Sequence, residues 1–361
     1  MATVVKRKET APAVQTTFLT RLGGRIRTQF LGNNFLVLIT FILFIAIYIA
    51  GSFIYRSKNF SSLNSFFDML NSNPGLIVIA AGMTMVMITG GIDISVGSQI
   101  ALYCMMLAFF IQNHNFNIYV AIGIVLVTGI LFGSMQGVLV SYFKLQPFIV
   151  TLAGLFLGRG LTAMISSNNI NITNTEFLGL AQMKIYFPFG GYTNAQGVYQ
   201  RPFIYLSVVL AIVAVIIVYV IMTWTKFGRS IYAVGGSEQS AMLMGLNAKR
   251  IKLFVYAFNG LLTAFGGFLF CLFSSGGAVD KAQGFEIRAI ASSVIGGAML
   301  TGGVGNIFGS FIGVLVTTTI QKFVNFNGTL ANGWPDIAVA AIMSFFIILQ
   351  SIFIYFRGTR K

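Results

Sequence analysis

Apolar runs long enough to cross a lipid bilayer recur along almost the whole chain. Of its 361 residues, 56% are hydrophobic and only 9% are charged, whereas a soluble domain carries about 25% charged residues. A membrane-spanning helix needs about 20 mostly apolar residues. The runs that approach this length lie at 34–55, 74–91, 96–113, 118–142, 147–166, 203–224, 251–275, 286–300, 306–324 and 335–356. We therefore expect an all-α polytopic membrane protein with about ten transmembrane helices.

The basic residues give this set of helices an orientation. The net charge of +15 does not indicate nucleic-acid binding, because the Lys and Arg residues gather before the first run, around 225–250 and at the C-terminal end. Basic residues on short connections mark the cytoplasmic side of a membrane protein. We therefore expect a basic cytoplasmic tail at 1–33, a membrane domain at 34–361, a cytoplasmic loop at about 225–250 and an external segment at 167–202.

Two similar glycine-rich decapeptides interrupt the apolar runs. They are TGGIDISVGS at 89–98 and TGGVGNIFGS at 301–310, and they indicate an internal pseudo-repeat with short or broken helices. Such breaks in corresponding halves are typical of transporter binding regions, because unpaired backbone is tolerated at membrane depth only where protein or water covers it. The alternative is that the glycines only let helices pack closely. The glycines concerned are Gly90, Gly91, Gly97, Gly302, Gly303 and Gly309.

Few residues could carry chemistry inside the membrane. Among the eight acidic residues, Asp93 is closest to an apolar interior, where an ionisable group is costly and is a functional candidate. It either caps the helix that follows it or contacts a substrate. The other polar residues within or beside the spans either join helices or line a hydrophilic path; as a tentative substrate path we take Ser95, Ser98, Gln136, Asn259, Asn306 and Ser310.

No pattern in the sequence indicates catalysis. We find no nucleophile beside a base and no Cys/His spacing typical of a metal site, so we expect no catalytic residue, no metal and no cofactor. A phosphate-binding loop ends in Gly-Lys-Ser/Thr, and the dipeptide Gly-Lys does not occur in this chain. If the protein pumps, another chain must hydrolyse the ATP.

Several motifs, in order, resemble those of one transporter family. GMTMVMITGGIDISVGS at 82–98 is similar to the hallmark of the carbohydrate-type ABC importer permeases, the family of the ribose permease. Three more stretches that resemble the family lie at 133–160, 227–256 and 289–315, and NFNGTLANGW at 325–334 looks closest to one permease of the two-permease galactofuranose importers. The resemblance runs from about residue 75 to the end of the chain.

The resemblance implies a function and a set of partners. It implies a multi-pass permease subunit of the bacterial cytoplasmic (inner) membrane that imports a pentose or hexose, with a galactofuranose-like sugar or fructose as candidates. The implied partners are a separate ATP-binding subunit, a periplasmic or extracellular sugar-binding protein, a second permease in a homodimer or heterodimer, and membrane lipid, but no nucleic acid. Two further hypotheses stay open: an importer of nucleosides or branched-chain amino acids, and a self-sufficient secondary carrier.

The same resemblance assigns the ATPase contact. Glu238, Ala241 and Gly245 match the Glu-x-x-Ala-x-x-x-Gly pattern of the family's coupling loop, which implies a short helix against the ATPase. Gly235 and Gly236 precede this pattern and belong to the same expected coupling region.

Two residues depart from the family pattern. Arg288 stands where the family commonly has an acid, and Gln136 where it has Asn. We expect Arg288 to pair with the nearby acids Asp280 and Glu286. Finally, we expect the two decapeptides to lie near each other in the fold, with the hydroxyls of Ser98 and Ser310 offering polar groups to a neutral sugar.

Overall fold

Helices form almost all of the structure. The computed structural model describes residues 34–56, 59–193, 199–328 and 333–358, so the predicted tail at 1–33 lies outside the described residues. The packing reported below lies within one unit, Leu36–Lys361. The helices are α2 (Asn34–Ile54), α3 (Leu63–Asn71), α4 (Pro74–Ile88), α5 (Val96–Ala108, continued by a π-helical turn, Phe109–Asn113), α6 (Ile118–Ser141), α7 (Pro147–Ile165), α8 (Thr175–Gln182), α9 (Leu206–Trp224), α10 (Lys226–Gly236), α11 (Glu238–Leu243), α12 (Ala248–Ser274), α13 (Phe285–Ile295), α14 (Ile307–Asn327) and α15 (Trp334–Gly358). The all-α prediction is confirmed.

Eight helices in the described part of the chain are long and apolar enough to cross a membrane: α2, α5 with its π-helical turn, α6, α7, α9, α12, α14 and α15. The other two predicted spans, 74–91 and 286–300, contain helices of only 15 and 11 residues, α4 and α13. The pair α3 and α4, bent by 62°, passes the same test together, which raises the count to nine. The short helices are therefore the two that end at the glycine-rich breaks.

The short helices lie in the core. Every residue of α4 is buried, and α4 packs against α9, α12, α13 and α14. A helix that is apolar on all sides needs such a position, since it has no polar face to turn toward water. By contrast, only 11% of the apolar stretch of α2 is buried within the chain. Its exposed apolar side chains suit contact with lipid or with another subunit.

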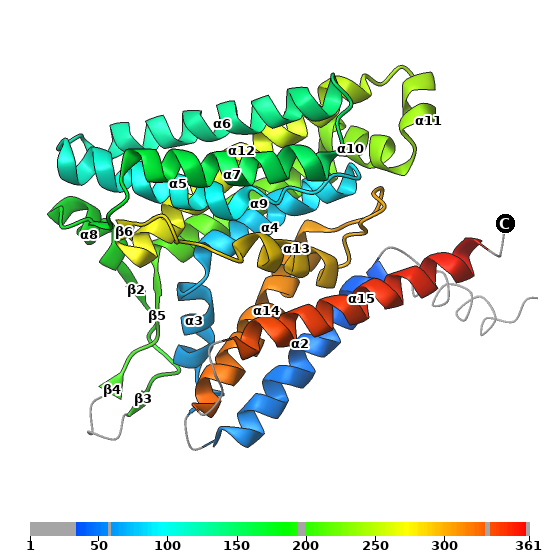
Figure 1. Cartoon of the computed structure of the whole chain (residues 1–361). Helices are drawn as coiled ribbons and strands as arrows, with labels where there is room; N and C mark the ends of the chain where they lie inside the picture. The colour runs from blue at the N-terminus through cyan, green and yellow to red at the C-terminus, as the bar shows by residue number, and fades with distance from the viewer. Residues whose placement is uncertain (1–33, 57–58, 194–198, 329–332, 359–361) are drawn as a thin grey trace, which may run out of the picture. The chain divides into compact units, whose positions relative to one another are not determined.

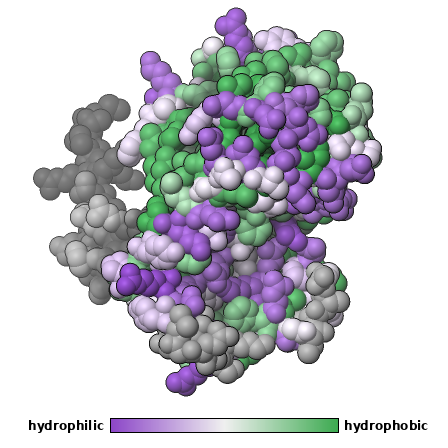
Figure 2. Space-filling model, turned by 90° about the vertical axis from the view of Figure 1, so that its left-hand side faces the viewer, coloured by the Kyte–Doolittle hydropathy of each residue, from purple (hydrophilic) through white to green (hydrophobic). Residues whose placement is uncertain are grey.

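The ends of the helices differ in what they carry. Figure 1 shows α10 and α11 at one end, and α8 with the short strands at the other. The strands pair antiparallel, β1 (Ile170–Asn171) with β6 (Gly276–Gly277), β2 (Lys184–Tyr186) with β5 (Phe203–Tyr205), and β3 (Tyr192–Thr193) with β4 (Tyr199–Gln200). Hydrophilic side chains spread over this second end between apolar margins (Figure 2).

Candidate functional site

Both decapeptides are breaks between helices. In the first, α4 ends at Ile88 and α5 begins only at Val96. In the second, α13 ends at Ile295, and Asn306 caps the start of α14 by accepting hydrogen bonds from the N–H groups of Phe308 (2.9 Å) and Gly309 (3.4 Å). Each short core helix is thus followed by an irregular segment and a longer helix.

The two breaks touch each other through their backbones. The N–H of Gly303 donates to the carbonyl oxygen of Ile88 at 2.8 Å. Gly302 has φ +84°, and a Cβ added there would lie 3.0 Å from the backbone nitrogen of Gly90. Only glycine adopts this conformation readily, and here the neighbouring backbone also leaves no room for a side chain. The prediction that the breaks lie near each other is confirmed.

The C-terminal end of α10 closes this contact from a third side. A Cβ added to Gly235 would overlap the carbonyl oxygen of Ile88, and would lie 2.8 Å from the nitrogen of Gly303. One turn earlier, the hydroxyl of Tyr232 donates to the carbonyl oxygen of Gly305 at 2.9 Å. We call the meeting point of Ile88, Gly90, Gly235, Gly302 and Gly303 the glycine junction. The sequence predicted its four glycines separately, but neither Ile88 nor that the coupling region meets both breaks.

A buried polar network forms beside the first break. Asp93 Oδ1 accepts hydrogen bonds from the N–H (2.9 Å) and Oγ (2.5 Å) of Ser95, and Asp93 Oδ2 accepts one from Asn259 Nδ2 (2.7 Å). Gln136 Nε2 donates to Ser95 Oγ at 2.7 Å. Asp93 is buried, with only 1% of the residue exposed. Ser95 at the start of α5 and Asn259 of α12 therefore bind one carboxylate, and Gln136 of α6 joins the network through Ser95.

The carboxylate does not cap α5 in the expected way. Asp93 binds Ser95, the residue just before the helix, whereas the side chain of Ser95 makes no cap bond. Asn259, near the middle of α12, supplies a partner that helix capping did not predict. Asp93 thus ties the first break to α12 as well as to the start of α5.

The network extends along α5 through residues that sequence reasoning missed. Gln99 Nε2 donates to Ser95 Oγ (2.7 Å), and the Tyr103 hydroxyl donates to Gln99 Oε1 (2.9 Å). These residues follow one another at intervals of four, so they share one helix face. Polar residues spaced by four on an otherwise apolar helix were the sequence signal that could have predicted this extension.

Several polar atoms of this region have no hydrogen-bond partner although they are buried. They are Gln136 Oε1, Asn259 Oδ1 and the Tyr256 hydroxyl. A buried polar atom without a partner costs about 1–3 kcal/mol, and such atoms in native structures call for a functional or local explanation. The Asp93 network therefore differs from an ordinary, fully satisfied helix contact.

The other predicted path residues have partners of their own. Ser98 Oγ donates to the Ser95 carbonyl (2.8 Å), and Ser310 Oγ lies 2.5 Å from Thr84 Oγ1. Both serines are fully buried. Asn306 caps α14, and Ser310 meets Thr84. Neither residue joins the Asp93 network.

Arg288 does not pair as expected. It forms its ion pair with Asp336 at 2.8 Å, rather than with Asp280 or Glu286. The expected pairing was wrong because α13 packs against α15, which brings Asp336 from its first turn.

The coupling region contains the short helix that the motif predicted, α11. Ser237 caps α11 by accepting from the N–H of Ser240 (3.2 Å), and Ala241 is fully buried against Val234 and Ala248. Gly245, after the helix, has φ +84°. The next residues after Ala241 are apolar and exposed to solvent: Met242 by 50%, Leu243 by 90% and Met244 by 69%.

Comparisons with known proteins agree on one family. Residues 65–352 match the family described as branched-chain amino acid transport system / permease component. The chain is 35% identical to the inner membrane ABC transporter permease protein YjfF of Escherichia coli K12 over 81% of this chain and 85% of that protein. It is 32% identical to the fructose import permease protein FruG of Bifidobacterium longum, over 79% of this chain and 82% of the relative. It is 33% identical to the ribose import permease protein RbsC of Escherichia coli K12, over 81% and 87%. No solved structure was found to match.

Proposed function

The chain belongs to this family of transport permease components, and on that premise we propose that it is the membrane-spanning subunit of an ATP-driven importer of a monosaccharide. The observation that carries the proposal is the similarity to ribose and fructose import permeases over about four fifths of the chain. This similarity favours a sugar over a nucleoside or a branched-chain amino acid. With eight or nine candidate spans among its described residues, the protein is a multi-pass protein of the cytoplasmic membrane.

The proposal includes a separate ATP-binding subunit seated on α11. Met242, Leu243 and Met244 are apolar and exposed in the basic segment that we predict to be cytoplasmic. An exposed apolar group rimmed by polar residues marks an interaction site. In the same segment Glu238 of α11 forms an ion pair with Lys252 of α12 at 2.6 Å. The ATPase supplies the chemistry, so this chain is a transport subunit and not itself an enzyme.

A mechanism for coupling follows from the glycine junction. Movement of α11 with the ATPase passes through α10 to Gly235, which lies against Ile88 at the end of α4 and Gly303 within the second break. Close-packed backbone transmits displacement because it cannot be compressed. In this proposal Asp93 holds the first break in shape while α4 and α14 move.

The other partners of the proposal meet the opposite end. A sugar-binding protein delivers the substrate there, and a second permease, identical or homologous, completes the membrane channel. The exposed apolar side chains of α2 suit that partner or the lipid.

Transport by the complete importer tests the proposed function. The chain is reconstituted in liposomes with its ATPase and binding protein, and uptake of D-ribose, D-fructose and D-galactose is compared with uptake of leucine and adenosine. We expect ATP-dependent uptake of at least one sugar and of neither control compound. Uptake of leucine or adenosine without any sugar would reassign the substrate class.

The orientation has its own test. Cysteines introduced at Asn174 and at Ser237, both in polar segments, are treated from outside with a reagent that does not cross the membrane. We expect modification at position 174 only, because the basic residues concentrate around 225–250. Modification at 237 from outside would reverse the proposed orientation.

A further inference from the structure

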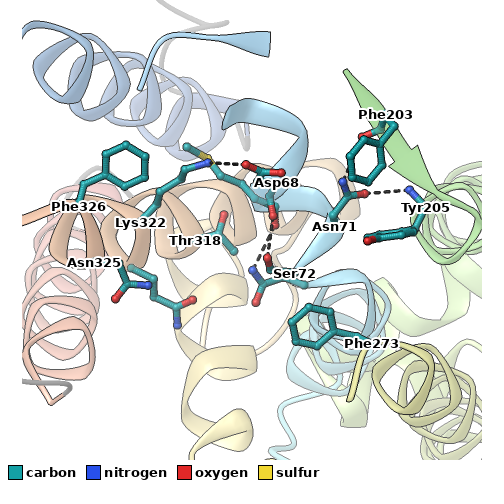
Figure 3. A pocket seen from close by; sticks show the side chains of 13 residues that line it. Asp68, Asn71, Ser72, Phe203, Tyr205, Phe273, Thr318, Lys322, Asn325 and Phe326 are labelled. Carbon is teal, nitrogen blue, oxygen red and sulfur yellow. Dashed lines mark hydrogen bonds and ion pairs between the residues drawn. The ribbon is translucent and has the colours of Figure 1, made fainter. Parts of the chain in front are cut away.

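A pocket of about 470 Å³ lies far from the glycine junction, at the opposite ends of α4 and α14 (Figure 3). Its volume falls within the range of about 300–1,000 Å³ that is usual for small-molecule sites. Helices α3, α12 and α14, strand β5 and the connection between α3 and α4 contribute to its walls. The lining residues are Asp68, Met69, Asn71, Ser72, Asn73, Phe203, Tyr205, Phe273, Thr318, Gln321, Lys322, Asn325 and Phe326.

The pocket lies on the side from which a substrate arrives in the proposed function. Phe273 lies at the end of α12 that is remote from α11, and Asn325 lies at the end of α14 that is remote from the junction. Strand β5 directly follows the 167–202 segment, which we predict to be external. The carboxylate of Asp68 remains 61% exposed, so this wall of the pocket is reached from solvent.

The lining is chemically suited to a neutral, polyhydroxylated ligand. Aromatic rings from Phe203, Tyr205, Phe273 and Phe326 stand among amide side chains. The flat faces of such rings pack against the C–H faces of a sugar ring, while amides and carboxylates bind pairs of hydroxyls. Among the lining residues there is one acid, Asp68, and one amine, so the pocket offers no excess of fixed charge.

The walls are held in place by bonds that do not need a ligand. Asn71 Nδ2 donates to the Phe203 carbonyl (3.1 Å), and Asn71 Oδ1 accepts from the Tyr205 N–H (2.9 Å), which fastens α3 to β5. Figure 3 shows the Lys322 ammonium pointing toward Asp68, with the Nζ and Oδ2 atoms 3.6 Å apart. Lys322 Nζ also donates to the Ser65 carbonyl.

The distances leave Asp68 with hydrogen-bonding capacity. Lys322 Nζ donates to the Ser65 carbonyl and lies 5.5 Å from the centre of the Phe326 ring. At 3.6 Å, its contact with Asp68 is an ion pair longer than a normal hydrogen bond. The exposed carboxylate oxygens can accept hydrogen bonds from hydroxyl groups. A preformed pocket with one charged acceptor binds with little ordering cost.

We propose that this pocket receives the monosaccharide as it leaves the binding protein, with Asp68 accepting hydrogen bonds from sugar hydroxyls and Phe273 contacting the sugar ring. This inference rests on the proposed function and adds a named site on this chain. The sugar then occupies the space between α3 and α14, next to the first residues of the buried helix α4. A bulky side chain introduced into the pocket is therefore expected to block transport without changing the glycine junction.

Two pairs of variants test the site. Asn325→Trp places an indole in the pocket, and Asn113→Trp places the same group on an exposed position outside it. Asp68→Asn removes the charged acceptor, and Glu176→Gln removes an exposed acid from α8. Binding of D-ribose, D-fructose and D-galactose to the purified full chain in nanodiscs is measured by saturation-transfer NMR, and uptake is measured in the complete importer.

We expect Asn325→Trp to lose sugar binding and uptake by about tenfold or more, and Asp68→Asn to weaken binding about fivefold, because a charged acceptor binds more strongly than a neutral one. Both control variants should match the parent protein. If the importer transports a sugar and Asn325→Trp transports it equally well, the pocket is not on the path and the inference is wrong, while the proposed function stands. If the parent importer takes up no sugar, the proposed function itself fails.

Discussion

At the glycine junction, the end of α4 and the segment before α14 meet through their backbones, whereas at the other end of α14 side chains from α3, β5, α12 and α14 surround a pocket. The junction consists of contacts such as the 2.8 Å bond from the Gly303 N–H to the Ile88 carbonyl. The pocket is bounded by longer contacts, such as the 3.6 Å ion pair of Lys322 and Asp68. The bent pair α3–α4 and helix α14 therefore take part in both regions, which we expect to tolerate displacement to different degrees.

This arrangement lets movement at the junction reach the pocket through α4 and α14. A helix of 15 residues such as α4 is about 22 Å long, and a helix moves as a rigid element. Between its ends, Thr84 of α4 contacts Ser293 of α13 (3.1 Å) and Ser310 of α14 (2.5 Å). A small displacement at the junction can then alter the spacing of side chains at the pocket.

The largest expected effect is at the junction, where two adjacent glycines give a matched test. A methyl group at Gly235 overlaps the Ile88 carbonyl, whereas one at Gly236 meets nothing within 4 Å. Overpacking costs about 1–3 kcal/mol and sometimes more, and here the neighbours are backbone atoms that cannot rotate away. We expect Gly235→Ala to reduce sugar uptake about a hundredfold, and Gly236→Ala to leave it near the parent level.

The amount of each variant in the membrane is measured by immunoblot alongside uptake, since a misfolded protein would also fail to transport. Retained protein with lost uptake and lost stimulation of the ATPase by substrate supports the junction as a coupling element. Equal uptake by the two variants would show that the junction tolerates a methyl group and transmits nothing.

The second effect concerns Asp93, which is bound by Ser95 and Asn259 beside the first break. Asp93→Leu leaves the N–H of Ser95 and the amide of Asn259 without their acceptor, and each lost partner costs about 1–3 kcal/mol. Asp93→Asn keeps an acceptor for Ser95, and Asn259 can turn its amide so that Oδ1, which has no partner now, accepts from the new amide. We expect uptake to fall about thirtyfold for Leu and less than about threefold for Asn. An Asn variant as inactive as the Leu variant, at unchanged stability, would show that the negative charge itself is needed.

A third test separates local pairing from contact with the ATPase. Glu238→Lys places two amines together in the 2.6 Å pair with Lys252 and reverses a charge on the proposed ATPase surface. Exposed pairs contribute about 0–1 kcal/mol, so the local loss is small, whereas a like charge at an interface costs several kcal/mol. We expect a roughly tenfold loss of ATPase stimulation that the exchange of both charges, Glu238→Lys with Lys252→Glu, does not restore. Full recovery in the double variant would limit Glu238 to a local role.

The sequence predicted elements better than contacts. Long apolar runs and the two glycine motifs were sufficient to predict the helices and their breaks, because spanning length and backbone satisfaction dictate them. Proximity across 212 positions of sequence was predicted from motif similarity, since matched halves tend to face one another. The role of Gly235 could not be predicted in this way, because nothing in the sequence GGS shows which glycine meets the Ile88 carbonyl.

The pocket was missed for a related reason. Apart from Asp68 and Lys322, its residues are uncharged side chains from segments at 68–73, 203–205 and 318–326 and from Phe273, and none stands out by spacing. Lys322 and Asp68, the two charged residues, come from helices 254 positions apart in the sequence. Only the bend of 62° between α3 and α4 brings Asp68 over the end of α14, and a bend between two short helices has no firm sequence signal.

The smallest expected effect is on stability at the pocket, and it sharpens the contrast with the junction. Asp68→Asn removes one partner of Lys322, but Lys322 still donates to the Ser65 carbonyl and still packs on the Phe326 ring. Since the Asp68 side chain is 61% exposed, water solvates its charge and the pair contributes only about 0–1 kcal/mol. We expect thermal unfolding in nanodiscs to shift by at most a few degrees, while sugar binding weakens as proposed above. A destabilisation above about 2 kcal/mol would instead identify the pair as a structural clamp between α3 and α14. The pocket end would then be held as tightly as the junction, and the two ends would no longer differ in the way that the proposed coupling requires.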